Sequence, residues 1–222
     1  MSKVPVITID GLSGAGKGTV SKMLCDELGW NILDSGALYR TLTYLIDKKG
    51  IAINEFLQKQ EVLIKDFEVS FQIGSLGEPV SIFLKEQDIT NLVRTEEIAE
   101  KTSAFSTLKE IRDFIRPCQR AFKQPPGLVA DGRDMGTVIF PEADLKIYLT
   151  ASLEERAKRR EIQLKRLGTK VNMRILLDEL EARDKKDIER KLSPLRPAKD
   201  SLTIDTTGLS PEEVLKKIKV LL

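Results

Sequence analysis

The chain has 222 residues, of which 41% are hydrophobic and 32% are charged, as in ordinary globular proteins. Its 36 basic side chains nearly balance 34 acidic ones, so the net charge of +2 argues against a protein that coats nucleic acid. The sequence has no histidine, which excludes histidine-based triads, histidine metal ligands and a histidine general base.

Cysteine content argues against a protein stabilised by disulfides or zinc, and hydropathy argues against a membrane-spanning protein. Cys25 and Cys118 are too few for a disulfide framework or a cysteine-held zinc site, so we expect free thiols that are buried or half-buried. No apolar run approaches the ~20 residues that span a bilayer, and the N-terminus lacks a signal-peptide pattern. We therefore expect a cytoplasmic protein without membrane or nucleic-acid partners, and a monomer by default.

The first fifty residues alternate between strand and helix patterns. A β-branched apolar run predicts a buried strand, and Gly29 marks the end of the helix that follows it. A short strand and a second helix come next. This order and spacing predict parallel βαβ construction. The four elements are expected at residues 4–10, 19–28, 31–34 and about 36–49.

The pattern changes in an insertion that we expect at roughly residues 63–102. Residues 67–73 alternate between apolar and polar side chains, and so do residues 80–84. The intervening GSLGEP, at residues 74–79, supplies a turn. Alternation with a period of two predicts an antiparallel hairpin with one polar face.

The remaining chain returns to helices and buried strands. One predicted helix is interrupted at Pro117, because proline lacks the N–H that a helix interior needs. Ser210 and Pro211 mark the start of the last helix. The other helices are expected at residues 94–103, 108–123, 153–167 and 172–192, the last two joined at Gly168, and the strands at 127–132, 145–150 and 201–205.

The segment GLSGAGKGT at residues 11–19 lies between the first strand and the first helix, as a phosphate-binding loop requires. Its glycines let successive N–H groups turn toward phosphate oxygens, and the helix adds its positive N-terminal end. Lys17 supplies a charge for the β- and γ-phosphates, and the Thr19 hydroxyl can join a Mg²⁺ shell. Because Gly18 precedes the hydroxyl residue, the form is that of nucleoside monophosphate kinases. The alternative is a glycine-rich turn without a ligand.

Two further turns are expected at the same edge of the sheet. Arg40 lies one turn into the helix after Asp34, where it either reaches a second phosphate or remains a surface arginine. The segment DGRDMG at residues 131–136 closes a buried strand, so Arg133 is a candidate for binding phosphate and Asp134 for accepting from a ligand amine. A structural ion pair of these two residues is the alternative.

Two helices near the end of the chain carry cationic stripes. Arg183, Asp187 and Arg190 share one helix face, although such a stripe is usually a solvated ion-pair ladder. These cations exceed the need of one triphosphate and indicate two phosphorylated ligands held end to end. A phosphate acceptor is already anionic and needs no general base, which fits the absence of histidine. The second stripe consists of Arg156, Arg159 and Arg160.

Taken together, these segments resemble the bacterial cytidylate kinase family over nearly the whole chain. The resemblance implies an α/β fold: a P-loop kinase core with a parallel sheet surrounded by helices, a small β-rich insertion in the monophosphate-binding part, and a helical lid. It implies one domain over 1–222, with a core at 1–34, 104–152 and 169–222, a monophosphate-binding part at 35–103 and a lid at about 153–168. The matching segments are GLSGAGKGT, DSGALYR, Val93-Arg94-Thr95, DGRDMGT, ERAKRR, ARDKKDIER, SPL and Asp205-Thr206-Thr207.

The resemblance implies ATP-dependent conversion of CMP and dCMP to their diphosphates, with Mg²⁺. The implied catalytic residues are Lys17, Arg133, Arg159 and Arg190. The implied ATP-binding residues are Gly11, Leu12, Ser13, Gly14, Ala15, Gly16, Lys17, Gly18, Thr19, Arg156 and Arg160, with Thr19 on the metal. The implied CMP residues are Ser35, Arg40, Arg133 and Arg190 at the phosphate, Ser103, Arg112 and Asp134 at cytosine, and Arg183 and Asp187 at the ribose.

Some positions depart from the family pattern, and two other functions stay open. Leu12 stands where the family often has proline, and the resemblance is loose at Asp34 and Asp131, which can orient Mg²⁺-bound water. One alternative is another monophosphate kinase, specific for UMP or AMP. The other is a GTP-binding switch, but the sequence has no N-K-x-D, and the D-x-x-G match at 205–208 lies too near the C-terminus for a base-binding motif to follow.

Overall fold

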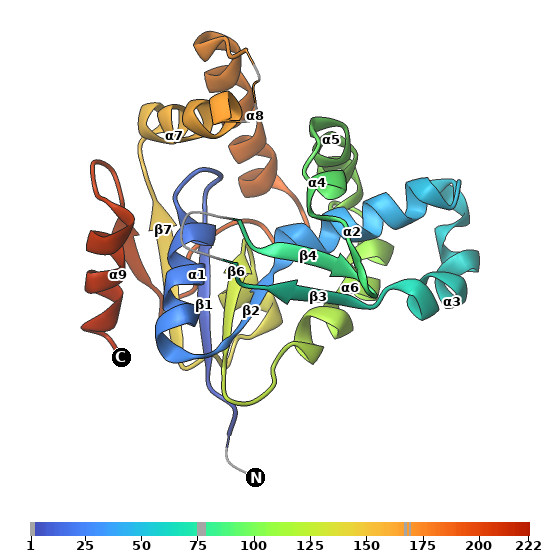
Figure 1. Ribbon diagram of the computed structural model, residues 1–222, viewed down its shortest axis with the longest axis horizontal. Coiled ribbons are helices and arrows are strands. Elements are labelled where there is room, and N and C mark those ends of the chain that lie inside the picture. Colours follow the sequence, from blue (N-terminus) through green and yellow to red (C-terminus); the bar gives the residue numbers. More distant parts are fainter. Residues whose placement is uncertain (1–2, 75–78, 167, 169) are drawn as a thin grey trace.

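The computed structural model describes residues 3–74, 79–166, 168 and 170–222. Its centre is a sheet in the order β2-β6-β1-β7-β8, in which every pairing is parallel. Helices surround this sheet (Figure 1), so the predicted α/β P-loop kinase fold is confirmed. The strands are β1 Val6–Gly11, β2 Asn31–Asp34, β6 Leu128–Gly132, β7 Leu145–Thr150 and β8 Leu202–Asp205.

The sheet order brings three loops together at one edge. Every residue of β1 is buried, as expected for a strand with helices on both faces. The register places Asp10 of β1 opposite Gly132 of β6, and Asp34 of β2 opposite Asp131. The carboxyl ends of β1, β2 and β6 therefore lie side by side, which is where ligands bind in open parallel sheets.

The helices follow the predicted order with two additions, α3 and the four-residue α4, which sequence patterns did not predict. Figure 1 shows α7 and α8 beyond the carboxyl edge of the sheet, above the loop after β1. None of the helices in the described residues is long and apolar enough to cross a membrane. The helices are α1 Lys17–Leu28, α2 Ser35–Lys48, α3 Phe56–Asp66, α4 Thr90–Val93, α5 Glu96–Phe105, α6 Lys109–Ala121, α7 Leu153–Arg166, α8 Met173–Glu189 and α9 Pro211–Lys219.

A second, antiparallel sheet lies within the predicted insertion. It pairs β3 Val69–Gln72 with β4 Ser81–Leu84, and β4 with the two-residue β5 Gln87–Asp88. The hairpin and its alternating burial are confirmed. Most of the predicted turn, residues 75–78, lies outside the described residues.

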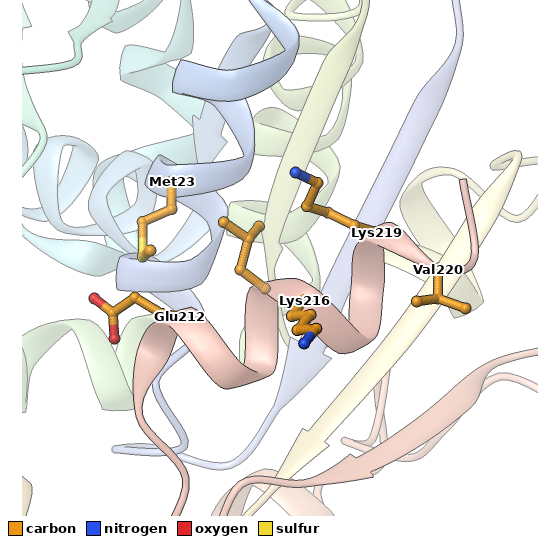
Figure 2. Close-up of a pocket in the computed structure, with 6 residues that line it drawn as sticks. Met23, Glu212, Lys216, Lys219 and Val220 are labelled. Carbon is orange, nitrogen blue, oxygen red and sulfur yellow. The ribbon is translucent and has the colours of Figure 1, made fainter.

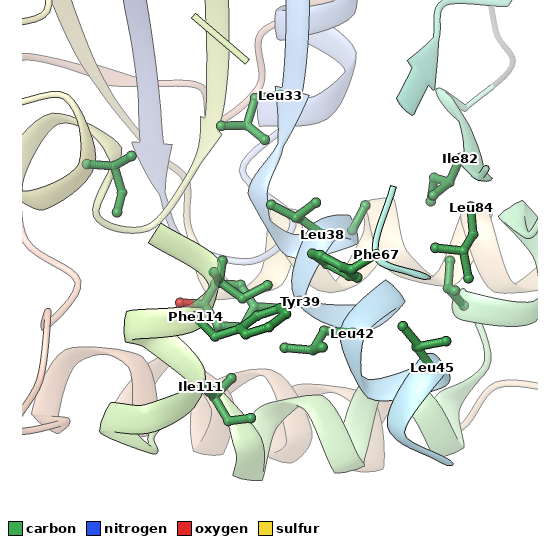
Figure 3. Packing of buried hydrophobic residues seen from close by; sticks show 14 of the residues in the cluster. Leu33, Leu38, Tyr39, Leu42, Leu45, Phe67, Ile82, Leu84, Ile111 and Phe114 are labelled. Carbon is green, nitrogen blue, oxygen red and sulfur yellow. The ribbon is translucent and has the colours of Figure 1, made fainter. Parts of the chain in front are cut away.

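The largest hydrophobic cluster joins α2 to this small sheet and to α6. The phenyl rings of Phe67 and Phe114 lie 5.6 Å apart between centroids, and α2 contributes leucines at helical spacing from one face. This packing ties the predicted monophosphate-binding part to the rest of the chain. Figure 3 shows the cluster, including Leu33, Leu38, Tyr39, Leu42, Leu45, Phe67, Ile82, Leu84, Ile111 and Phe114.

Several local predictions can be compared with the structure. Gly29 ends α1 with a φ of 65°, and both cysteines are free, Cys25 buried and Cys118 half-buried, so these predictions are confirmed. The predicted interruption at Pro117 is wrong, because α6 continues through it. The proline is exposed, and the buried Phe114 and Ile115 beside it hold the helix against the core despite the missing N–H.

Candidate active site

The loop after β1 has the backbone conformation that only glycines adopt readily. Gly11, Gly14 and Gly16 have φ values of 148°, 78° and 90°. A Cβ on Gly11 would lie 2.0 Å from the carbonyl oxygen of Leu149, so no larger residue fits there. Gly16 begins α1 without a side-chain cap, which leaves the first N–H groups of the helix available to an anion.

Lys17 lies folded back over this loop. Its side chain is buried, and Nζ donates to the carbonyl oxygen of Leu12 at 2.9 Å. Burial, together with the charge of the nearby Arg133, lowers the pKa of Lys17 to about 8. A buried cation beside a second cation is stabilised by an anion, so this position favours phosphate binding.

Two buried carboxyls, those of Asp10 and Asp131, lie at the carboxyl edge of the sheet, and Asp10 supports the turn that follows β6. Asp10 accepts hydrogen bonds from the N–H groups of Met135 and Gly136, both at 2.8 Å. Burial raises the pKa of Asp10 to about 6 and that of Asp131 to about 7. A Cβ on Gly18 would lie 3.5 Å from Asp131 Oδ2, so the Asp131 carboxyl faces the first turn of α1.

Three predicted phosphate or ribose ligands form a cationic cluster at this edge. Burial, together with the charges of Arg133 and Arg40, lowers the pKa of Arg183 to about 10. Burial also lowers the pKa of Arg40. Arg133 donates through Nε to Asp187 Oδ2 at 2.9 Å. These guanidinium groups lie close enough to repel one another, and a bound polyanion would relieve that repulsion. The cluster is therefore suited to binding a polyanion.

The residues predicted to read cytosine include one tight pair. Arg112 Nη2 lies 2.8 Å from Asp134 Oδ2, and each side chain is only 6% exposed. Arg112 also donates to Tyr39 Oη at 3.2 Å, and its guanidinium lies 5.8 Å from the ring centroid of Tyr39. Tyr39 was missed from the sequence, although it stands inside the segment DSGALYR.

Other predicted CMP ligands are held by different contacts. No hydrogen bond between described residues joins Ser103 to Arg112 or Asp134; its carbonyl accepts from the Ser106 hydroxyl instead. Arg190 donates to the Ser193 carbonyl at 2.6 Å, while its Nη2 is buried without a partner. Nη2 therefore remains a donor for a ligand.

The three arginines of α7 have different surroundings. Arg156 is 4% exposed, pairs with Asp184 and donates to the Ser13 carbonyl at 3.1 Å, so it holds the loop itself. Arg159 donates to the carbonyl of Thr206 at 2.7 Å, and a Cβ on Gly16 would lie 3.6 Å from its Nη1. Arg160 pairs with Glu96 on α5. Their predicted contacts with ATP phosphates stay predictions.

The hydroxyl residues Thr19 and Ser35 complete the predicted set of ATP and CMP ligands. Thr19 is exposed in the first turn of α1, and Leu12 and Ser13 form part of the loop before it. Ser35 begins α2, and its Oγ accepts from Gln119 Nε2 at 2.9 Å. Gln119 was also missed, because no local pattern links it to a residue 84 positions away.

A surface depression elsewhere lacks this chemistry. Figure 2 shows it between α1 and α9, lined by aliphatic and charged side chains and by none of the site arginines. The candidate site is therefore recognised by its charges and backbone donors rather than by the depth of a hollow. The lining residues are Met23, Glu212, Leu215, Lys216, Lys219 and Val220.

Comparison with known proteins agrees with this arrangement. A family model described as cytidylate kinase matches residues 7–221. The chain belongs to the cytidylate kinase family. Proteins named cytidylate kinase from Pseudomonas entomophila (strain L48) and Stutzerimonas stutzeri (strain A1501) are 48% and 49% identical to it. The alignments cover 98% and 97% of this chain, and 95% and 93% of those proteins.

Solved structures also align with the chain, at lower similarity. A shikimate kinase from Acinetobacter baumannii covers 98% of this chain and 92% of its own, with 18% identity and a TM-score of 0.42. Membership of the cytidylate kinase family, expected from the sequence, depends on the far closer relatives and is confirmed.

Proposed function

We propose that this member of the cytidylate kinase family transfers the γ-phosphoryl group of ATP to the phosphate of CMP or dCMP. A CMP phosphate oxygen attacks the γ-phosphorus in line, the new P–O bond forms as the bond to the β-phosphate oxygen breaks, and ADP leaves. The acceptor oxygen is already anionic, so no side chain must remove a proton. The observation that carries this proposal is a phosphate-binding loop beside a cluster of half-buried arginines.

The loop is the proposed site for the ATP phosphates. The N–H groups of residues 11–19 and the open start of α1 donate to phosphate oxygens, and Lys17 leaves the Leu12 carbonyl to bind the β- and γ-phosphates. Arg156 holds the loop through the Ser13 carbonyl, and Arg159 lies beside Gly16. These groups neutralise the charge that develops during transfer.

The arginine cluster is the proposed site for CMP. Its phosphate lies among guanidinium groups and the Ser35 hydroxyl, and Asp134 accepts from the amine of cytosine. Uracil has a carbonyl in place of that amine. The carbonyl and the carboxylate of Asp134 are both acceptors, so no hydrogen bond forms between them and UMP is disfavoured. The proposed phosphate ligands are Ser35, Arg40, Arg133 and Arg190, the base ligands are Ser103, Arg112 and Asp134, and the ribose ligands are Arg183 and Asp187.

Mg²⁺ is the proposed cofactor, bound together with ATP. Within the described residues no group of three or more acidic or cysteine side chains forms a metal cage. Mg²⁺ needs no such cage, because it keeps several waters and binds substrate phosphates with one or two protein oxygens. The exposed Thr19 hydroxyl and the Asp131 carboxyl facing α1 fit that requirement. When bound, the ion neutralises phosphate charge and orients the γ-phosphate.

We also propose that the protein acts in the cytoplasm as a monomer, without a nucleic-acid or membrane partner. ATP and CMP are cytoplasmic metabolites, and one chain supplies both anion sites. The net charge of +2 gives little attraction to nucleic acid. Light scattering coupled to size-exclusion chromatography would measure the mass directly, and a stable dimer would contradict this part of the proposal.

A coupled assay of ADP release tests the reaction. It is run with ATP, Mg²⁺ and each of CMP, dCMP, UMP and AMP, and we expect kcat/KM to be highest for a cytidine monophosphate. Lys17→Met is the matched inactive variant, because it keeps side-chain length and removes the charge. A preference for AMP, or equal rates with UMP, would overturn the proposed substrate.

A further inference from the structure

Gln119 is a buried polar residue that the proposed chemistry does not use. It lies on α6, is 1% exposed, and donates through Nε2 to Ser35 Oγ at 2.9 Å. Its Oε1 is buried without a hydrogen-bond partner. An unpaired buried acceptor destabilises a fold, so an apolar side chain of similar size would suit this part of the core better. The contact with Ser35 is the feature that distinguishes glutamine here.

The hydrogen bond determines what the Ser35 hydroxyl can do. A serine hydroxyl has one hydrogen to donate and two lone pairs to accept with. Because the Gln119 amide donates to Oγ, one lone pair is used and the hydroxyl hydrogen is directed away from Gln119. No other partner of this hydroxyl exists among the described residues. Ser35 is therefore held as a donor with its hydrogen free.

The position of Ser35 explains where that hydrogen is needed. Ser35 is the first residue of α2 and follows Asp34, which lies opposite Asp131 at the carboxyl edge of the sheet. The helix N-terminus there is electropositive, and Arg40 follows one turn later. Ser35 is also 4% exposed, so bulk water reaches it poorly. An anionic oxygen is the acceptor that fits this environment.

We propose that Gln119 is a positioning residue that orients the Ser35 hydroxyl to donate to the phosphate of the monophosphate substrate. This inference rests on the proposed function, since it takes Ser35 as a phosphate ligand. Gln119 acts only through Ser35 and touches no substrate. Its effect is confined to CMP, because the ATP phosphates bind at the loop formed by residues 11–19.

A double-mutant cycle tests the inference. The dissociation constant for CMP is measured by calorimetry in the wild type, Ser35→Ala, Gln119→Met and the double variant, alongside the melting temperature and the KM for ATP. Loss of a hydrogen bond to a charged group should weaken CMP binding about tenfold in Ser35→Ala, and about three- to tenfold in Gln119→Met. The double variant should match Ser35→Ala. The KM for ATP should not change, and Gln119→Met should melt at the same or a higher temperature.

A matched control separates this role from a general loss of buried polarity. Thr43→Val removes a buried hydroxyl from the same helix, about 12 Å further along it, and should leave CMP binding unchanged. If Gln119→Met fails to fold, Gln119→Asn withdraws the amide from Ser35 and keeps its polarity.

The possible failures are distinguishable. Unchanged CMP binding in Ser35→Ala overturns the proposed phosphate role of Ser35, and with it this inference. Weakened binding in Ser35→Ala but not in Gln119→Met overturns the inference alone. Additive effects in the double variant also overturn it, because Gln119 would then act independently of Ser35.

Discussion

The guanidinium of Arg160 on α7 pairs with the carboxylate of Glu96 on α5. This ion pair joins the predicted lid, at about 153–168, to the predicted monophosphate-binding part. The charges of Arg160 and Glu96 both act on the half-buried Arg40: Arg160 lowers its pKa and Glu96 raises it. Arg160 is a predicted ligand of the ATP phosphates, and this prediction implies that Glu96 and ATP compete for the same guanidinium.

Glu96→Gln should therefore improve ATP binding modestly. The side chain of Glu96 is 71% exposed, and exposed ion pairs contribute only about 0.2–1 kcal/mol, so we expect the KM for ATP to fall by two- to fourfold. The gain should shrink at 0.5 M KCl, since salt screens exposed charges. Glu97→Gln is the control, because Glu97 pairs with Lys101 within α5 and not with the lid. A rise in the KM for ATP would mean that the pair assists closure instead.

Asp134→Asn should relax the choice of base. The amide keeps the shape of the carboxyl but offers a donor that can pair with the uracil carbonyl, so the ratio of kcat/KM for CMP to that for UMP should fall about tenfold or more. Both kcat/KM values are measured on the same preparation, so any unfolded enzyme lowers them equally and does not change their ratio. This control is needed because the substitution leaves the buried Arg112 without its counter-charge, and removing one partner of a buried ion pair costs about 3–5 kcal/mol of stability.

Asp113→Asn provides the comparison for that measurement. Asp113 lies on α6, as Arg112 does, but it is exposed and pairs with Lys109. Its substitution should leave the ratio for CMP and UMP unchanged. If Asp134→Asn also left the ratio unchanged, the base-reading role of Asp134 would be wrong.

The phosphate-binding loop could be predicted from the sequence because its determinants are local. The three glycines with positive φ stand within six consecutive positions, next to a strand that is apolar almost throughout. The same reasoning found the turn at 131–134, where Arg133 and Asp134 follow the buried strand β6. Backbone geometry and strand burial are encoded over a few neighbouring residues in both places.

Contacts between distant segments could not be predicted in the same way. The sheet order interleaves strands that are far apart in the chain, and only this order brings α6 and its Gln119 against Ser35. Helix α3 was missed because its periodicity is blurred by exposed apolar side chains, including Leu57 and Ile64. The two-residue β5 is too short to show alternation.

The stability of the protein should depend on pH through Asp10. Burial raises the pKa of Asp10 from 3.8 to about 6, so the folded state binds this proton more tightly than the unfolded state. The stabilisation that comes from this tighter proton binding is fully present below pH 3.8 and is lost as the pH rises through about 6. A shift of this size corresponds to about 3 kcal/mol.

Asp10→Asn removes this titration, while its amide fits the two N–H donors of Met135 and Gly136 less well. We therefore expect the variant to be less stable than the wild type at pH 4, and the difference to shrink toward pH 7.5. Urea unfolding at several pH values measures it, with the exposed Asp26→Asn as the control. A difference that stays constant with pH would contradict the proposed origin.

Pro117→Ala should stabilise the protein. The substitution restores an N–H that can donate to the Asp113 carbonyl and removes the ring from the interior of α6, where proline costs about 3 kcal/mol. Alanine also makes the unfolded chain more flexible, which offsets about 0.4–1 kcal/mol of this gain. Because Pro117 is exposed, core packing should not change. We expect a net gain of about 1–2 kcal/mol and a melting temperature higher by about 2–8 °C.

Pro211→Ala is the control, and it should lower the stability. Pro211 occupies the first position of α9, where its fixed φ suits the helix and its missing N–H costs nothing. Equal or lower stability of Pro117→Ala would show that α6 is built around the proline, with the free carbonyl already satisfied by water.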